Sequence, residues 1–415
     1  MIPEFYIDSP SNRSPRVGLA GAGMAQGMSY VASMRTSTTS RGPAKLPARF
    51  LFDGDLGDQL LKHLQEDAAA ARLSSKFKVY YRFRACMPIF VRQMLQRGRN
   101  RNLTVPDNWH IPTQFFDGFR AGIANQRPDR VLIHPWPDGM QMSAVLTHDV
   151  ETKAGLDQVF ALADVEESLG FRSCWNLIPH KYPVDPGIVA ELKWRGHEVG
   201  VHGYNHDGRL FESKGLFNSR KAPINEAIER FGSGGFRAPM VHRNLLWLQE
   251  LNIDYDASCF DVDPFQAMPG GVGGVWPFFA GKFVELPYTL PQDHTLLVAL
   301  GQTSPSIWID KFRWLARMRG MAMLITHPDY LDSPKRMDTY RQYLEFLTEQ
   351  KDQCWMALPQ EVVSWWRQRD GMEIVNDSGP RVVGPASERA TLTTLQDMYP
   401  KWTRRPTRVQ LDSKC

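Results

Sequence analysis

Cysteine is scarce in this chain of 415 residues, which has five cysteines, none of them in a CxxC pair. A disulfide framework or a cysteine-rich zinc site is therefore not expected. No apolar run reaches the roughly 18 residues that suggest a membrane-spanning helix. The formal net charge of +4 is too small to indicate a nucleic-acid partner. These absences favour a cytoplasmic globular protein with free thiols.

Composition divides the chain into four regions. Residues 1–48 are rich in Ser, Gly, Arg and Pro without periodicity, which predicts a disordered segment. Residues 49–139 form a basic, partly helical region, and residues 140–370 alternate short apolar runs with helical stretches. The polar, proline-containing tail, residues 371–415, is expected to be irregular.

The basic region contains a stretch, residues 72–101, in which nine Lys and Arg side chains occur without one acidic residue. Aromatic and aliphatic residues are interleaved with these charges. Two interpretations are open: a solvated basic face over a small packed element, or a segment that contacts anionic lipid headgroups at a membrane surface. The second would make the protein peripheral to the membrane.

Residues 140–370 read as alternating strands and helices. The pattern predicts seven buried strands, at Ser143–Leu146, Phe171–Ile178, Glu198–Val201, Gly235–Arg237, Ile253–Ser258, Phe283–Leu286 and Met321–Ile325. Helices are expected at Leu156–Leu169, Pro186–Arg195, Lys221–Phe231, Leu245–Leu251, Ile307–Arg319 and Lys335–Glu349. Such alternation is typical of a parallel sheet. The glycine fingerprint of a dinucleotide-binding open sheet is missing, which favours a distorted (β/α)7 TIM-like barrel with an N-terminal extension.

Reactive side chains cluster at the ends of these predicted strands. The segments are Thr147–Glu151, His202–Asp207, Arg237–Met240, Asp256–Ser258 and Thr326–Pro328. In an α/β barrel, the carboxyl ends of all strands open on one face. We therefore expect these groups to converge at a single rim.

His202 and His206 are four residues apart, directly after a predicted strand. At this spacing, one turn of chain can direct two imidazoles at one point. Zinc and related ions bind two imidazoles with a carboxylate and leave one position open for water. The pair indicates a metal site, since histidines that only pack in a core are less often found together with other reactive side chains at strand ends.

Two carboxylates, Asp149 and Glu151, are available to complete that site. They are two residues apart, so on a strand both face the same way. One can ligate the metal while the other takes a proton from a water molecule. From the residues alone the order of these roles is open, and Asp149 stays a candidate for both.

His327 and Arg237 also stand at strand ends. A histidine titrates near neutral pH, so His327 is a candidate acid for a leaving amine. Arg237 can hold a carboxylate with its guanidinium, and Asp149 is a plausible partner. Asp293, just after the sixth predicted strand, is read either as a substrate contact or as a loop anchor.

In their order, these segments resemble the motifs of the polysaccharide deacetylase family, also known as the NodB-homology or carbohydrate esterase 4 family. That family has an acidic pair on the first strand, then HxxxH, RxPY, an Asp-containing segment and LxxHP. This chain has Thr147–Glu151, His202–His206, Arg237–Met240, Asp256–Ser258 and Leu324–Pro328. Five motifs in order are far more specific than any single one.

The resemblance implies a divalent metal ion, zinc first, and hydrolysis of an N-acetyl amide on an amino-sugar or oligosaccharide, with or without a lipid carrier. It implies Asp149 as base, His202 and His206 as ligands, His327 as acid and Arg237 as the tether of the base. Two further assignments depend on it. Val150 separates an acidic pair that the family has adjacent, so Glu151 is the expected third ligand, and Asp256 is the expected catalytic Asp of the fourth motif. A cyclic amide or ureide as substrate, and a non-catalytic sugar-binding relative, are the alternatives.

Overall fold

The computed structural model describes residues 48–52, 103–266, 268 and 271–403, and the single positions 57, 75, 79, 87 and 98. These residues all fall within one compact unit, Ala44–Cys415. Residues 1–47 and nearly all of the basic stretch 72–101 lie outside the described residues. The predicted disorder of the first segment and the membrane contact of the second therefore stay predictions. None of the described helices is both long enough and apolar enough to cross a membrane.

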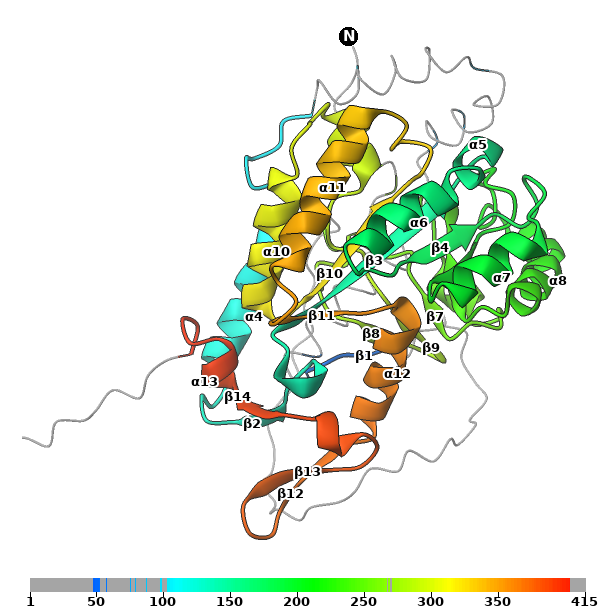
Figure 1. Cartoon of the computed structure of the whole chain (residues 1–415). Coiled ribbons are helices and arrows are strands. Elements are labelled where there is room, and N and C mark those ends of the chain that lie inside the picture. Colours follow the sequence, from blue (N-terminus) through cyan, green and yellow to red (C-terminus); the bar gives the residue numbers. More distant parts are fainter. Residues whose placement is uncertain are drawn as a thin grey trace, which may run out of the picture. The chain divides into compact units, whose positions relative to one another are not determined.

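The core of the described chain is a ten-stranded sheet in the order β1-β8-β9-β7-β6-β5-β4-β3-β10, with β11 also paired to β3 (Figure 1). The strands are β1 (Ala48–Arg49), β3 (Met142–Val150), β4 (Cys174–Leu177), β5 (Glu198–His202), β6 (Gly235–Arg237), β7 (Tyr255–Asp256), β8 (Phe278–Ala280), β9 (Phe283–Glu285), β10 (Met321–Thr326) and β11 (Cys354–Met356). The long central strand β3 is buried along its whole length. Buried strands of this kind need helices on their outer face.

Within the run β9-β7-β6-β5-β4-β3-β10 each pair of adjacent strands is parallel, which makes seven parallel strands, whereas β8 is antiparallel to β9. The sheet curls until its two ends approach each other. Beyond β9, the backbone N–H groups of Thr289 and Leu290 donate to the Met323 carbonyl on β10, at 3.2 and 3.1 Å. The predicted distorted barrel is thus confirmed, with irregular chain completing the ring in place of a regular strand pair.

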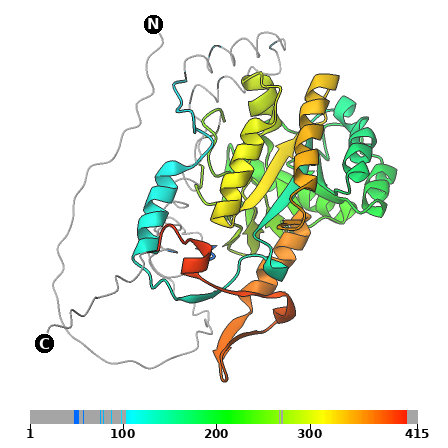
Figure 2. The ribbon, with the colours of Figure 1, turned by 60° about the vertical axis from the view of Figure 1, so that its left-hand side comes forward.

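Helices follow most of the strands and cover the outside of the curled sheet (Figure 1). They are α4 (Thr113–Ala124), α5 (Lys153–Leu156), α6 (Val159–Ser168), α7 (Pro186–Trp194), α8 (Lys214–Phe231), α9 (Leu245–Leu248), α10 (Ser306–Met318), α11 (Pro334–Thr348), α12 (Pro359–Asp370) and α13 (Leu395–Met398). Every predicted strand and helix of residues 140–370 overlaps one of these elements. Both Figure 1 and Figure 2 show that α10 and α11 run side by side along β10.

Local sequence signals fix where the longer helices begin and end. The Asp185 carboxylate accepts a hydrogen bond from the Gly187 N–H at 2.8 Å at the start of α7. The Ser213 hydroxyl accepts one from the Leu216 N–H at 3.2 Å at the start of α8. These side chains satisfy N–H groups that have no partner within the helix. Gly232, with φ of 52°, ends α8 in the left-handed conformation that glycine adopts without strain.

Strand side chains alternate between the barrel interior and the layer of helices outside. Asp149 is in register with Asn176, and His202 with Arg237, so these four side chains share the interior. The neighbouring residue, His148, faces outward and contacts Glu166 of α6, with 2.8 Å between Nε2 and Oε1. The period of two along a strand therefore decides which strand-end residues can reach the rim.

The described part of the C-terminal tail differs from the irregular structure that we expected. β12 (Glu373–Asn376) and β13 (Pro380–Val383) form an antiparallel hairpin, and β14 (Leu392–Thr394) pairs with β2 (Val131–Ile133). Proline is tolerated at the first position of an edge strand, which is where Pro380 lies. In Figure 2 this tail lies beside α4, and the ring centroids of Phe119 in α4 and Tyr399 are 5.9 Å apart.

Candidate metal centre and catalytic rim

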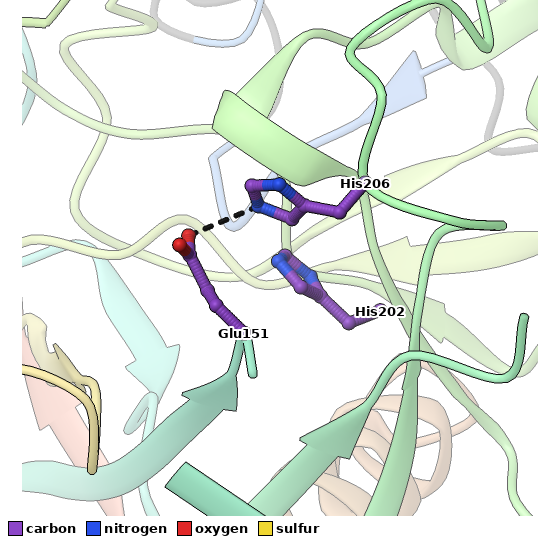
Figure 3. Close-up of side chains that lie close together, drawn as sticks. All are labelled: Glu151, His202 and His206. Carbon is purple, nitrogen blue, oxygen red and sulfur yellow. Dashed lines mark ion pairs between the residues drawn. The ribbon is translucent and has the colours of Figure 1, made fainter. Parts of the chain in front are cut away.

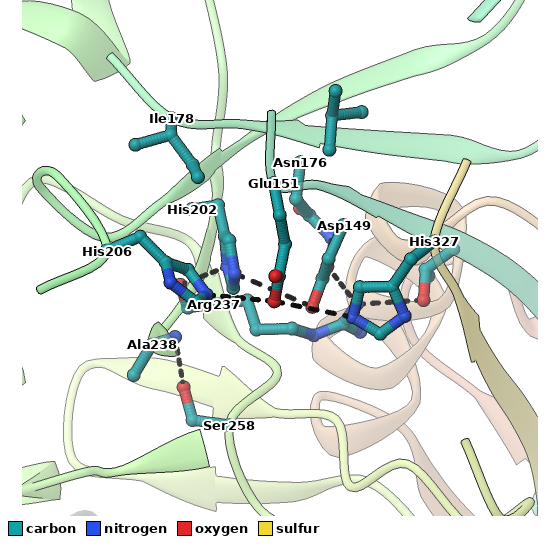
Figure 4. Close-up of polar contacts among 12 residues, drawn as sticks. Asp149, Glu151, Asn176, Ile178, His202, His206, Arg237, Ala238, Ser258 and His327 are labelled. Atoms are coloured by element: carbon teal, nitrogen blue, oxygen red, sulfur yellow. Dashed lines mark hydrogen bonds and ion pairs between the residues drawn. The ribbon is translucent and has the colours of Figure 1, made fainter. Parts of the chain in front are cut away.

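The predicted site residues, with one exception, come together at the carboxyl ends of the strands (Figure 4). Asp149 lies near the end of β3 and Glu151 directly follows that strand, while His202 ends β5. Arg237 ends β6, and His327 directly follows β10. Residues separated by almost 180 positions along the chain therefore meet because parallel strands all end on the same face.

Three of these side chains form a cluster that could hold a metal ion. One donor atom from each of Glu151, His202 and His206 lies within 4.8 Å of the other two (Figure 3). The Nε2 atom of His206 is 3.0 Å from Oε1 of Glu151. Among the described residues this is the only group of three or more such donors found. Two imidazoles and one carboxylate are the ligands that a catalytic zinc site uses, with a further position left open.

The hydrogen bonds of the two imidazoles fit metal binding. Nδ1 of His202 lies 3.1 Å from the Arg237 carbonyl oxygen, and a proton on Nδ1 leaves the Nε2 lone pair free to ligate. His206 is buried, its Nδ1 has no hydrogen-bond partner among the described residues, and its Nε2 faces only Oε1 of Glu151, another donor atom of the cluster. A buried nitrogen without a partner is costly, and a metal ion would remove that cost.

The loop from His202 to His206 is shaped by close packing. His206 itself has a φ of 60°, an uncommon value for a residue with a side chain. Gly203 has a φ of 65°, and a Cβ placed there would lie 2.4 Å from Cδ of Pro239. Only glycine fits this approach. The loop is thereby held against the chain that follows Arg237, which keeps both imidazoles directed at Glu151.

Asp149 lies beside this cluster but outside it. Its Oδ1 accepts hydrogen bonds from Nη1 of Arg237 and Nδ2 of Asn176, both at 2.9 Å. The predicted pairing of Arg237 with Asp149 is therefore present. Oδ2 of Asp149 lies 3.8 Å from Nε2 of His202. Burial would raise the pKa of Asp149, but Arg237, together with His202 and His327, outweighs it and holds that pKa well below its ordinary value.

Two members of the cluster, Glu151 and His202, show the same competition between burial and charge in their pKa values. Burial raises the pKa of Glu151, but the neighbouring His206 brings it well below the ordinary value. Burial lowers the pKa of His202 to about 4, because nearby carboxylates only partly offset the loss of water. At neutral pH the arrangement thus combines an ionised carboxylate with a neutral imidazole, the forms that ligate metals.

His327 is held by a residue that sequence reasoning had left ambiguous. Nδ1 of His327 lies 2.7 Å from Oδ1 of Asp293, and the His327 N–H donates to Asp293 Oδ2 at 2.6 Å. Burial opposes the charge on this imidazole, but Asp293 prevails and raises the pKa of His327 to about 10. Nε2 of His327 lies 3.8 Å from Oε1 of Glu151, so the ring faces the cluster.

Asn176 is a residue of the site that the sequence analysis missed. It lies on β4 and donates to Asp149 from inside the barrel. The available signal was a polar residue in the apolar second half of the predicted strand Phe171–Ile178. Gly200 makes room for it, because a Cβ there would lie 2.1 Å from Oδ1 of Asn176.

Asp256 is the exception, because the structure does not bring it to the rim. It is in register with Phe236 on one side and Glu285 on the other, on the outward face of the sheet. Ser258 donates to Asp256 Oδ1 at 2.6 Å, and the Ala238 N–H donates to the Ser258 hydroxyl at 2.8 Å. A residue one position from an inward-facing one points outward. Asp256 therefore contacts the neighbouring chain through Ser258, and its predicted catalytic role stays a prediction.

Fold and site together define a class: an α/β barrel with a candidate mononuclear metal centre at its rim, next to a carboxylate that is not part of the donor cluster. No family model matches the chain, and no curated protein matches it either.

Solved structures similar to the chain include a Mycobacterium smegmatis protein described as a polysaccharide deacetylase, with 20% identity, 56% of this chain and 92% of that chain covered, and a TM-score of 0.46. An allantoinase has 14% identity, 59% and 95% coverage and a TM-score of 0.45. A Pseudomonas aeruginosa PAO1 protein described as a polysaccharide deacetylase has 15% identity, 60% and 97% coverage and a TM-score of 0.45. The chemistry of this chain must be inferred from its own site.

Proposed function

We propose that this protein is a metal-dependent hydrolase that removes N-acetyl groups from an amino-sugar or oligosaccharide. One observation supports this proposal above the others: an ionised carboxylate, Asp149, is buried beside a cluster of three metal donors while its own partners occupy only Oδ1. A hydrolase of this kind needs a metal site and an unligated base next to each other.

The donors Glu151, His202 and His206 would hold the ion, and zinc suits two imidazoles with one carboxylate. When bound, such an ion supplies a Lewis acid that polarises an amide carbonyl and makes a nearby water molecule more acidic. The ion pair with Arg237 keeps Asp149 ionised and holds it still, so that Oδ2 is available to accept the proton of the attacking water.

His327 lies on the other side of Glu151 and provides the matching proton donor. Because Asp293 occupies Nδ1, the free Nε2 is the atom from which His327 would protonate the departing amine. Asp293 also supports the positive charge of the ring. A base and an acid with opposite charge states at one pH are what amide hydrolysis requires, since one proton is taken and one is returned.

The choice of an N-acetyl sugar as substrate is supported by the ordered set of five motifs, which resembles the polysaccharide deacetylases. The same donor set and base would also suit a small ring amide, which is why the test includes one. Acetate release from oligomers of N-acetylglucosamine should be measured with the zinc-loaded protein and after treatment with a strong chelator. Hydrolysis of a cyclic ureide such as allantoin should be measured beside it.

The proposal predicts acetate release that disappears on chelation and returns when zinc is added, with little turnover of the ureide. Ureide hydrolysis without acetate release would show that the substrate is a ring amide instead of an N-acetyl sugar, while the proposed metal site would stand. Chelator-insensitive acetate release, or no zinc bound by the folded protein, would contradict the metal-dependent mechanism itself.

A further inference from the structure

The peptide unit that joins Val150 to Glu151 is held by a side chain at each end. The Tyr182 hydroxyl donates to the Val150 carbonyl oxygen at 2.5 Å. The Glu151 N–H donates to Oδ2 of Asp329 at 2.9 Å. Both contacts fall on one planar unit, so together they fix its orientation. The two side chains come from different loops, after β4 and after β10.

This peptide needs such support because regular pairing stops just before it. β3 pairs with β4 as far as Val150, opposite Leu177, and with β10 only as far as His148, opposite Thr326. Glu151 therefore has no strand partner to define its backbone. Residues beyond the last ladder bond are free to turn unless side chains or water satisfy their polar groups.

Each member of the pair is itself fixed in place. Tyr182 is buried and its oxygen also accepts the Ile178 N–H at 3.2 Å. Burial raises the pKa of Tyr182, which keeps it protonated as a donor. Asp329 also accepts a hydrogen bond from the Thr152 hydroxyl through Oδ1. Gly155 leaves room for this carboxylate, because a Cβ there would lie 2.4 Å from Oδ2 of Asp329.

We propose that Tyr182 and Asp329 form a peptide clamp that positions Glu151 as the third metal ligand. The inference rests on the proposed metal centre and adds two residues to it that touch neither metal nor substrate. It also explains the spacing of the acidic pair. With Val150 between them, Asp149 remains on the strand as base, and the clamp turns Glu151 beyond the strand toward His206.

The test is the zinc affinity of the full-length protein, measured by competition with a chromophoric chelator. Asp329→Ala removes both acceptors and should weaken zinc binding by about 10- to 100-fold, the range found when partners that orient metal ligands are lost. Asp329→Asn keeps one amide oxygen for the Glu151 N–H, so it should recover much of the affinity. Tyr182→Phe should weaken binding in the same direction as Asp329→Ala.

The control is Asp332→Ala, which removes a nearby carboxylate that is 53% exposed and pairs with Arg336. Its zinc affinity should equal that of the unchanged protein. Thermal unfolding of each metal-free variant shows whether it folds, and Tyr182→Phe serves as the test if Asp329→Ala does not fold. To distinguish a general structural role of Asp329 from a role in positioning Glu151, the zinc affinity of Asp329→Ala is also measured in a Glu151→Gln background.

If the clamp acts through Glu151, Asp329→Ala should cost little further affinity once Glu151 is replaced, because the two changes are coupled. An equal loss in both backgrounds would overturn the clamp. Unchanged zinc affinity in Asp329→Ala, Asp329→Asn and Tyr182→Phe would also overturn the clamp but leave the metal centre intact. No zinc binding by the unchanged protein would overturn both.

Discussion

Two pairs of largely buried carboxylates, one toward the barrel interior at the end of β3 and one on the outward face of β7 and β9, behave in opposite ways. Inside, Asp149 and Glu151 have pKa values below the ordinary range. Outside, Asp256 and Glu285 have pKa values above it, because burial dominates their environment. All four carboxylates lose most of their water, so burial does not distinguish the pairs.

The difference is the distance to positive charge. Arg237 donates directly to Asp149, and His206 lies against Glu151. The outward pair has mainly each other as neighbours, and the attraction of Arg243 is too weak to offset burial. A buried carboxylate is prepared for catalysis when a cation keeps it ionised, and it serves structure when it keeps its proton. Four predictions test this comparison.

The largest effect is expected for His206→Ala. It removes one of two imidazoles from the donor cluster, so zinc binding and acetate release should both fall below detection. Metal content after dialysis and an acetate assay measure this. His180→Ala is the matched control, because His180 is an exposed histidine that lies outside the cluster, with its ring tilted against Tyr204 at a centroid distance of 4.5 Å. Retention of stoichiometric zinc by His206→Ala would remove the basis for the comparison.

The next effect separates the two faces directly. Asp149→Asn removes the proton acceptor and should lower kcat by about 10²- to 10⁴-fold while zinc stays bound. Asp256→Asn lies on the outward face and should leave kcat of the folded protein near its original value. Steady-state kinetics and metal analysis of both variants decide the question. Equal losses from the two substitutions would mean that the two faces are not functionally distinct.

A smaller effect is expected from the residue that supports Asp149 inside the barrel. Asn176→Ala removes one of the two hydrogen bonds to Oδ1 and should lower kcat about tenfold, equivalent to about 1.4 kcal/mol in the barrier. Gly200→Ala should act in the same direction by displacing the Asn176 side chain. Gly118→Ala, where an added Cβ meets nothing within 4 Å, is the control. A change in KM alone would argue against positioning of the base.

The smallest effect concerns stability rather than activity. Glu285 has a pKa raised well above 4.5 by burial. Its contribution to stability is therefore full below pH 4.5 and lost as pH rises through the folded-state pKa. Glu285→Gln keeps an oxygen for the Cys259 N–H and has no proton to lose. Its free energy of unfolding should exceed that of the unchanged protein by on the order of 1 kcal/mol at about pH 8.

Urea unfolding across this pH range measures that difference. It should grow with pH and vanish near pH 4.5. Glu373→Gln on the exposed strand β12 is the control and should show no such trend. A difference that stays constant with pH would show that Glu285 is ionised when folded, and the contrast between the two faces would then be lost.

The sequence predicted those features that depend on local pattern. Period-two and helical runs gave every strand and helix expected between residues 140 and 370, since those segments are strongly apolar. The convergence of Asp149, Glu151, His202 and His327 followed from parallel topology alone. The pairing of β14 with β2 could not be foreseen, because it joins positions about 260 residues apart and depends on no local signal.

The site was harder to complete than to locate. Asp293, Asn176 and Asp329 act through contacts that span 34, 27 and 178 residues of sequence, so the nearby sequence does not reveal which partner each of them holds. The placement of Asp256 away from the rim was not foreseen, because a motif gives order along the chain but not the face of the strand. The register of β7 against β6 and β9 supplies that information.

The most direct test is anomalous diffraction at the zinc edge from a crystal of the protein soaked in zinc. A single peak should lie about 2.0–2.2 Å from one nitrogen of each of His202 and His206 and one oxygen of Glu151, with Asp149 unligated and still paired to Arg237. A peak coordinated by Asp149, or no peak among these residues, would contradict a metal centre with a separate base.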